Sequence, residues 1–197
     1  MKNKILGIDP GTNILGYGIL NFEGKHLKVE AMGVLHLEKY PDHTTKLKEI
    51  FLQLQDIIET YLPATLSVEA PFFGKNVQSM LKLGRAQGVA MAAGMTMGLD
   101  IYDYSPKSIK KSVTGNGNAS KEQVASMLGH ILKVNFVDEY LDATDALAAA
   151  MTHYNNNGIG ADFPDTKKKS STKSKFPKAK KATSWETFVK NNQGRVK

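Results

Sequence analysis

The sequence predicts a mixed α/β domain built round a central sheet, and three observations support this fold class. Apolar runs of strand length and longer segments with apolar residues at helical spacing occur in the order three strands, helix, strand, helix, strand, helices. The chain has 197 residues, 41% of them hydrophobic, which suffices for one domain with its own core. It has no cysteine, which excludes a disulfide framework and thiolate zinc sites.

The N-terminal part predicts three consecutive strands. The first covers residues 4–9 and ends at an Asp-Pro-Gly turn, where proline and glycine stop a strand. The second covers residues 16–22 and is followed by a turn at Gly24, and the third covers about residues 28–37. Short links between consecutive strands favour an antiparallel meander.

The rest of the folded part alternates helices with two short strands. The predicted elements are a helix from Thr44 or Thr45, which caps it, to Pro63, a strand over 66–69, a helix from Asn76 to about Gly98, a strand over 100–104, helices opening at 106 and 121, and a helix over 138–154. Ser105 before Pro106 fits a cap followed by a first-turn proline, and Ser120 with Gln123 fits a capping box.

The basic excess of the chain lies at its C-terminal end. The formal net charge is +7, from 26 basic and 19 acidic residues, but residues 164–197 alone hold 11 basic and 2 acidic residues. Residues 1–163 therefore carry a net charge of −2. We expect a folded domain over 1–160 and a basic, largely disordered tail over 161–197, in which 184–190 could form a short helix.

Neither of the two most apolar segments has the pattern of a signal peptide or of a membrane-spanning helix. Asp9 interrupts the N-terminal apolar stretch too early for a signal peptide, and residues 88–99 fall far short of the ~20 residues that a membrane span needs. We therefore expect a soluble, cytoplasmic protein with no membrane partner. Its basic excess suggests a polyanionic partner.

Four acidic residues stand where they could converge. Asp9 and Glu69 end two predicted strands, and Asp142 and Asp145 share one face of the last helix. If the strands are parallel neighbours and the helix leans on the same sheet edge, the four carboxylates meet and repel each other. Mg²⁺ or Mn²⁺ would relieve this, because hard cations prefer oxygen ligands, and two such ions ~3.5–4 Å apart can flank a scissile phosphate.

Each of these carboxylates also has an ordinary explanation. Asp-Pro-Gly is common turn chemistry, and an acidic residue at the end of a strand is usually solvated. Asp142 and Asp145 would also favour the positive N-terminal end of the last helix. Asp145 fits this explanation poorly, because residues 146–150 after it are expected to be buried.

Several short motifs occur together in one order and spacing. They are residues 5–12, Gly16-Tyr17-Gly18, Val68-Glu69 leading to Phe72 and Lys75-Asn76, residues 81–88, residues 142–148 and Thr152-His153. Over about residues 4–155 the chain thus resembles the RuvC Holliday junction resolvases. The resemblance implies an RNase H-like fold, with a mixed five-stranded sheet and helices on both faces.

The same resemblance implies an activity and partners. It implies a homodimer that nicks four-way DNA junctions symmetrically in recombination and repair, with the RuvA–RuvB branch-migration complex as a partner. It also implies two Mg²⁺ ions per subunit, for which Mn²⁺ can substitute.

The resemblance assigns roles to particular residues. The implied metal-binding catalytic carboxylates are Asp9, Glu69, Asp142 and Asp145. Phe72 matches an aromatic residue that stacks on a base near the cut. Lys110 and Lys121 match basic residues that flank the cleaved strand, and Lys121, counted here with the catalytic residues, is the better candidate for the scissile region.

Two positions depart from the family pattern. Ala70-Pro71 is less polar and stiffer than the pattern, which leaves the path of the loop after Glu69 open. Some family members carry a histidine where Asp142 stands in this chain. The tail beyond about residue 160 is not covered by the resemblance.

A basic block lies in the middle of the folded part. Residues 75–121 hold 7 basic and 2 acidic residues, and the expected phosphate contacts among them are Lys75, Arg85, Lys110 and Lys121. Gly84 and Gly88 permit close backbone approach, either within the domain or at a dimer contact. We expect His153 on the helix surface rather than in a metal site.

Three other classes of function share parts of this pattern. An actin-like ATPase or sugar kinase also opens on a strand with an Asp-x-Gly-Thr turn, but 163 folded residues are too few for its duplicated domain. A junction-binding protein without chemistry would not need all four carboxylates. Another RNase H-like nuclease, one that cuts RNA–DNA hybrids, differs from a junction resolvase only in its substrate.

Overall fold

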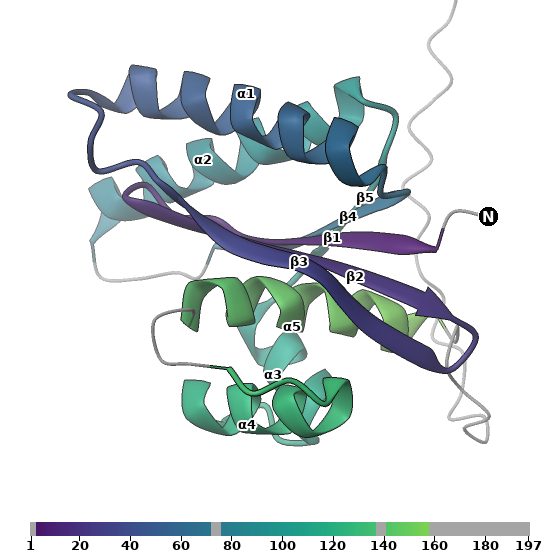
Figure 1. Cartoon of the computed structure of the whole chain (residues 1–197). Coiled ribbons are helices and arrows are strands. Elements are labelled where there is room, and N and C mark those ends of the chain that lie inside the picture. Colours follow the sequence, from purple (N-terminus) through teal and green to yellow (C-terminus); the bar gives the residue numbers. More distant parts are fainter. Residues whose placement is uncertain (1–2, 72–75, 137–140, 158–197) are drawn as a thin grey trace, which may run out of the picture. The chain divides into compact units, whose positions relative to one another are not determined.

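A five-stranded sheet forms the centre of the fold, with helices on both faces (Figure 1). The computed structural model describes residues 3–71, 76–136 and 141–157. The strands are β1 (Lys4–Asp9), β2 (Ile14–Glu23), β3 (His26–His36), β4 (Thr65–Glu69) and β5 (Asp100–Tyr104), in the spatial order β3-β2-β1-β4-β5. β1–β2 and β2–β3 pair antiparallel, whereas β1–β4 and β4–β5 pair parallel, which confirms the mixed sheet.

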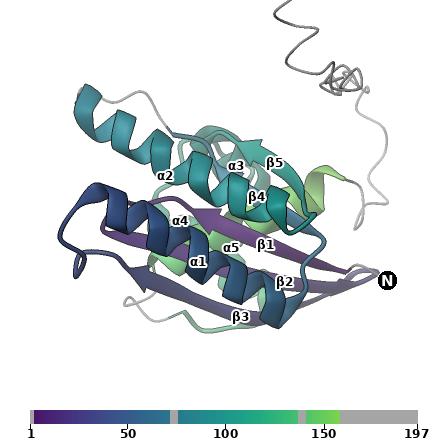
Figure 2. The ribbon, with the colours of Figure 1, turned by 90° about the horizontal axis from the view of Figure 1, so that it is seen from above.

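The helices form one layer on each face of the sheet. The upper layer of Figure 1 consists of α1 (His43–Tyr61) and α2 (Val77–Thr96), which lie side by side in Figure 2. On the opposite face α5 (Leu141–Asn156) packs directly on β1 and β2. There α3 (Pro106–Thr114) and α4 (Lys121–Leu132) pack on the outer side of α5, so that α5 is enclosed.

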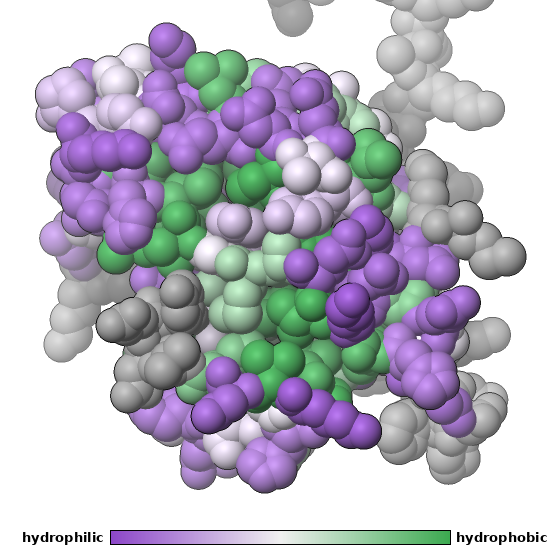
Figure 3. All heavy atoms as spheres, viewed as in Figure 1, coloured by the Kyte–Doolittle hydropathy of each residue, from purple (hydrophilic) through white to green (hydrophobic). Residues whose placement is uncertain are grey.

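Side chains of the central strands alternate between the two helix layers. In β1, Leu6 and Ile8 belong to the core under α1 and α2, whereas Ile5 belongs to the core under α5. Odd-numbered residues of β1, including Asp9, therefore face α5. Figure 3 shows the same side of the molecule as Figure 1, with β3 at the front. Apolar side chains gather along the middle of this side, between the more polar surfaces of the two helix layers.

Three helices begin where the local signals predict, and one does not. Asn76, Ser105 and Ser120 cap α2, α3 and α4 with their side-chain oxygens. α1 is capped by Asp42, whose carboxylate accepts hydrogen bonds from the Thr45 backbone N–H at 2.9 Å and hydroxyl at 2.6 Å. The prediction of a threonine cap was wrong, because the earlier aspartate already occupies the free N–H groups of the first turn.

The hairpin of β2 and β3 is longer than predicted. Pairing continues to Glu23 and His26 and leaves a two-residue turn, in which Gly24 has φ 57°. Such turns need positive φ, which glycine adopts without strain, so the strands pair up to the turn itself.

Some predictions fall on parts of the chain that lie outside the described residues. These are residues 138–140 of the last helix and the tail over 161–197 with its short helix at 184–190. Within the described ranges, no helix is both long and apolar enough to cross a membrane.

Candidate active site

Two carboxylates lie at the carboxyl ends of neighbouring parallel strands. β1 and β4 pair in register up to Ile8 and Val68, so Asp9 and Glu69 are the next residues on the two strands. Both follow the alternation of the strands and face the α5 side of the sheet. The structure thus brings these carboxylates to one edge of the sheet, as the sequence pattern predicts.

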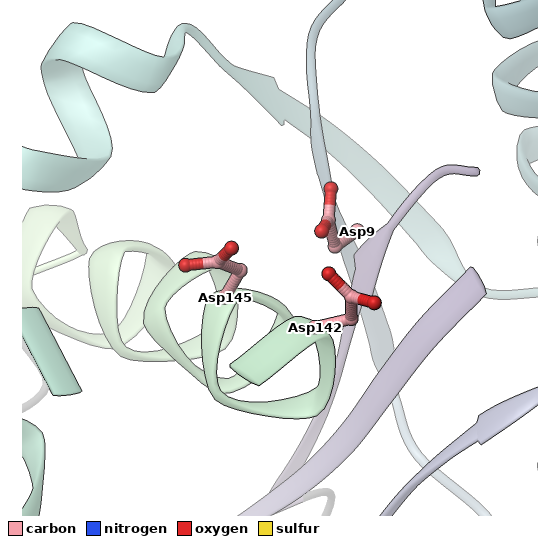
Figure 4. A group of neighbouring side chains, drawn as sticks. All are labelled: Asp9, Asp142 and Asp145. Atoms are coloured by element: carbon pink, nitrogen blue, oxygen red, sulfur yellow. The ribbon is translucent and has the colours of Figure 1, made fainter. Parts of the chain in front are cut away.

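Two further carboxylates come from the start of α5. Figure 4 shows Asp142 and Asp145 on the part of α5 next to the end of β1, where Asp9 lies. Asp9, Asp142 and Asp145 each offer one carboxylate oxygen, and these three oxygens lie within 4.8 Å of one another. We call these three residues the Asp cluster. Its donors are all carboxylate oxygens, the ligands that Mg²⁺ and Mn²⁺ prefer.

Glu69 lies beside the Asp cluster and shares a small cavity with it. The cavity has a volume of about 80 Å³ and is lined by Asp9, Glu69, Asp145, Lys110, Lys121 and apolar residues of α3 and α4. Two elements of the sheet and three helices therefore contribute to one site. All four carboxylates that the sequence singles out lie in the Asp cluster or line this cavity.

The electrostatics of the site reflect an excess of buried negative charge. Burial, together with the negative charges of the neighbouring Glu69 and Asp145, raises the pKa of Asp9 from its ordinary 3.8 to about 8. Burial also raises the pKa of Glu69 to about 7, together with the charge of Asp145, while Lys121 and Lys110 oppose the shift. The two lysines thus compensate the carboxylates only in part, and the site favours additional positive charge.

Lys121 is the basic residue most closely held in the site. Its Nζ donates a hydrogen bond to a carboxylate oxygen of Asp145. Burial alone would lower the pKa of Lys121, but this hydrogen bond and the charges of Asp145 and Asp9 give a net increase. Lys121 is the first residue of α4, whose start is fixed by the reciprocal bonds of the Ser120–Gln123 capping box.

The other predicted DNA contacts are placed differently. Lys110 of α3 lines the cavity. Arg85 is exposed on α2 in the other helix layer. There, the pKa of His43 is lowered by the burial of His43 and, second, by the positive charge of Arg85. Phe72 and Lys75 lie outside the described residues.

His153 is buried, so the prediction that it lies on the helix surface was wrong. The residue is 4% exposed, its Nδ1 lies 3.0 Å from the Tyr104 hydroxyl, and its ring lies 4.2 Å from that of Tyr102, centre to centre. Burial lowers the pKa of His153 to about 4. The sequence could not reveal this, because the side chains that cover the ring come from β5, which is distant from α5 in the sequence.

Gly84 and Gly88 do not serve close packing among the described residues. A Cβ atom built at either position would meet no atom within 4 Å. Packing against the described part of the domain therefore does not explain these glycines, and a dimer contact stays a prediction.

The sequence pattern missed the residues that lie beneath α5. Gly7, Gly16 and Gly18 face this helix, and a Cβ atom at any of the three would lie less than 3 Å from it. The hydroxyl of Ser67, buried in β4, donates a hydrogen bond to the Ala149 carbonyl oxygen at 2.7 Å. The available signal was the pair of glycines at alternate positions of β2, with Gly7 of β1 opposite one of them.

Comparison with known proteins identifies the relatives of this chain. The family model described as crossover junction endodeoxyribonuclease RuvC matches residues 5–153. The crossover junction endodeoxyribonuclease RuvC of Cytophaga hutchinsonii is 49% identical over 193 residues, which cover 98% of this chain and 88% of the relative. The protein of the same name from Porphyromonas gingivalis is 53% identical over 154 residues, covering 76% and 80%.

Solved structures agree with these relatives. The RuvC of T. thermophilus in complex with a Holliday junction substrate matches with a TM-score of 0.73 and 28% identity, over 79% of this chain and 94% of that chain. A yeast mitochondrial Holliday junction resolvase matches with a TM-score of 0.63 over 80% of each chain, and at 14% identity it shares the fold alone. The RNase H-like fold class is therefore confirmed.

Proposed function

Because this chain belongs to the RuvC family of crossover junction endodeoxyribonucleases, we propose that it cuts four-way DNA junctions by divalent-cation-dependent hydrolysis of a phosphodiester bond. Its role is that of a Holliday junction resolvase in recombination and repair. The observation that carries the proposal is the Asp cluster, in which oxygens from β1 and α5 lie within 4.8 Å of one another.

The donor set fits Mg²⁺, with Mn²⁺ as a substitute. Asp9, Asp142 and Asp145 supply only oxygen ligands, and Glu69, which lines the same cavity as Asp9 and Asp145, supplies another for a second ion. The raised pKa of Asp9 supports this assignment, since it reflects burial and then neighbouring negative charge, both of which a bound cation would compensate. When bound, such ions lower the pKa of an attacking water and stabilise the charge of the leaving oxygen.

The lysines of the cavity bind the phosphates next to the cut. Lys121 stays positively charged beside Asp145, so it offers ammonium donors to the oxygens of a phosphate that enters the cavity. Lys110 supplies a second positive charge from α3. Together they offset the repulsion between the anionic DNA strand and the carboxylates.

Further DNA contacts come from outside the cavity. Phe72 stacks on a base near the cut, and Lys75 and Arg85 bind phosphates of the junction arms. The basic tail over 161–197 adds a contact that does not read sequence.

Symmetric nicking requires two sites, and α2 supports a homodimer. Val77 and Leu81 are apolar residues, 59% and 52% exposed, on the same side of α2 as Gly84 and Gly88. The glycines allow a second helix to approach closely along this stripe. The RuvA–RuvB branch-migration complex would deliver the junction to the dimer in the cytoplasm.

The decisive experiment compares substrates in the presence of Mg²⁺. We expect paired nicks at symmetric positions of a four-way junction, no cutting of linear duplex and little cutting of an RNA–DNA hybrid. Asp145→Asn should bind the junction without cutting it, whereas Asp103→Asn, which removes an exposed carboxylate of β5, should cut normally. Preferred cutting of the hybrid would instead support the related RNase H-like activity, and cutting by Asp145→Asn would contradict the metal site.

A further inference from the structure

The central part of the sheet face beneath α5 is built from residues with almost no side chain. The cross-strand partners Gly7 and Gly18, two pairs before Asp9 and Gly16, lie on this face of β1 and β2. Ser67 is the partner of Gly7 on the other side, in β4. Helix α5 therefore lies on a floor of three glycines and one serine, next to the Asp cluster.

The backbone of α5 touches this floor at the residues that matter for the site. A Cβ atom on Gly16 would lie 2.0 Å from the carbonyl oxygen of Asp142, and one on Gly7 would lie 1.9 Å from that of Ala146. Real Cβ atoms do not approach an oxygen so closely, so any other residue at these positions would displace the helix. The two contacts lie at Asp142 itself and directly after Asp145.

Ser67 fixes the same helix along its axis. Its hydroxyl donates a 2.7 Å hydrogen bond to the carbonyl oxygen of Ala149, one turn after Asp145, and Ser67 is fully buried. Two residues further along β4, on the same face, stands Glu69. This bond therefore connects the strand that carries one carboxylate of the site to the helix that carries two others.

We infer that Gly7, Gly16 and Ser67 are positioning residues for the metal site. The glycines set the height of α5 above the sheet, and Ser67 sets its position along the sheet. Together they determine how far the carboxylates of α5 lie from those of β1 and β4. The inference rests on the proposed function, because it concerns the same carboxylates.

The test measures binding of Mn²⁺ to the protein without DNA, by the loss of the free-Mn²⁺ electron paramagnetic resonance signal. Ser67→Ala should weaken Mn²⁺ affinity roughly tenfold, as is typical when a residue that orients metal ligands is changed. Gly16→Ala should weaken it further, on the order of 100-fold, because a displacement of about 1 Å has effects of that size. Junction affinity measured without metal should not change for Ser67→Ala.

The matched control is Gly33→Ala on the opposite face of the sheet. The three atoms nearest to a Cβ atom there all belong to the side chain of Tyr17, whose hydroxyl lies at 2.9 Å and can move. We expect this variant to lose some stability and to keep its Mn²⁺ affinity. If the role of Ser67 is merely structural, Ser67→Ala should likewise lose some stability and keep its Mn²⁺ affinity. An unchanged Mn²⁺ affinity in Ser67→Ala would therefore overturn the inference.

Asp9→Asn separates this inference from the proposed function. If Asp9→Asn binds Mn²⁺ as tightly as the wild type, the metal site itself is wrong. If Asp9→Asn loses Mn²⁺ while Ser67→Ala and a folded Gly16→Ala keep it, only the positioning role is wrong. Should Gly16→Ala fail to fold, Ser67→Ala decides the question alone, because removing its hydroxyl creates no clash.

Discussion

The two faces of the central sheet use the same strands for different purposes. The face toward α1 and α2 carries large aliphatic side chains, which are Leu6, Ile8, Leu15, Ile19, Leu66 and Val68. The face toward α5 carries glycines and Ser67 in its centre and Asp9 and Glu69 at one end. Both faces bury apolar area that stabilises the fold, but the buried charges that make the site lie on the α5 face.

This division shows how a small domain tolerates a destabilising site. Buried carboxylates with raised pKa values, such as Asp9 and Glu69, oppose folding in the absence of a cation. The aliphatic face lies only one residue away on each strand, since neighbouring side chains point to opposite sides. Each strand thus offsets the cost of its carboxylate with its own apolar residues.

The largest effect is expected from Asp9→Asn, on the α5 face. Removing this carboxylate from the Asp cluster should lower the nicking rate by roughly 10³-fold or more. The cation loses a ligand, and the charge that develops in the transition state is then less well stabilised. The metal-free variant should be no less stable than the metal-free wild type, because it lacks the carboxyl whose pKa is raised by folding and which therefore opposes folding above about pH 4. Single-turnover nicking and urea unfolding check the two parts, with Asp103→Asn as the charge-matched control. Nicking at the wild-type rate would break the contrast between the faces.

The opposite pattern is expected from Leu66→Ala, on the aliphatic face. Leu66 is fully buried, and its truncation should lower the free energy of unfolding by about 2–5 kcal/mol. The nicking rate per folded molecule, measured well below the unfolding temperature, should stay close to that of the wild type. If the nicking rate falls by more than the unfolded fraction of the protein explains, the aliphatic face also contributes to the site.

The pH dependence of stability sharpens the comparison. In the folded state the pKa of Asp9 is about 8 and that of Glu69 is about 7, whereas their ordinary pKa values are 3.8 and 4.5. Between these limits the folded state binds more protons than the unfolded state, so the metal-free protein loses stability as the pH rises from about 4 to 8.

Urea unfolding in a chelator at several pH values measures this slope. Asp9→Asn should flatten it, and Asp103→Asn should leave it unchanged. Mg²⁺ should stabilise the wild type more at pH 8 than at pH 6, because binding a cation competes with binding protons. A wild-type stability that rises steadily over this range would contradict the electrostatics of the site.

The smallest effect concerns His153, which lies on α5 far from the Asp cluster. Its pKa is lowered from 6.5 to about 4, so the unfolded state binds a proton there before the folded state does. The associated stability is present above about pH 6.5 and is lost as the pH falls toward 4. The stability difference between the wild type and His153→Gln should therefore narrow below pH 6.5. A difference that stays constant down to pH 4 would show that His153 is not held neutral.

Local signals predicted most elements of the fold. Strand β5 and the caps Asn76, Ser105 and Ser120 lie where the sequence places them, because caps and turns depend on a few adjacent residues. The cap of α1 was misplaced because Asp42 and two threonines all fit the same local pattern.

By itself, the sequence determined the order of the elements, the ends of strands at Asp9 and Glu69, and the shared helix face of Asp142 and Asp145. Tertiary structure alone decided that Asp9 meets these two residues while Glu69 stands beside them, and that Lys121 pairs with Asp145. These distances depend on how closely α5 approaches strands β1 and β4, which end more than 70 residues earlier in the chain. That approach is set by packing between distant segments, and no local pattern of residues encodes it.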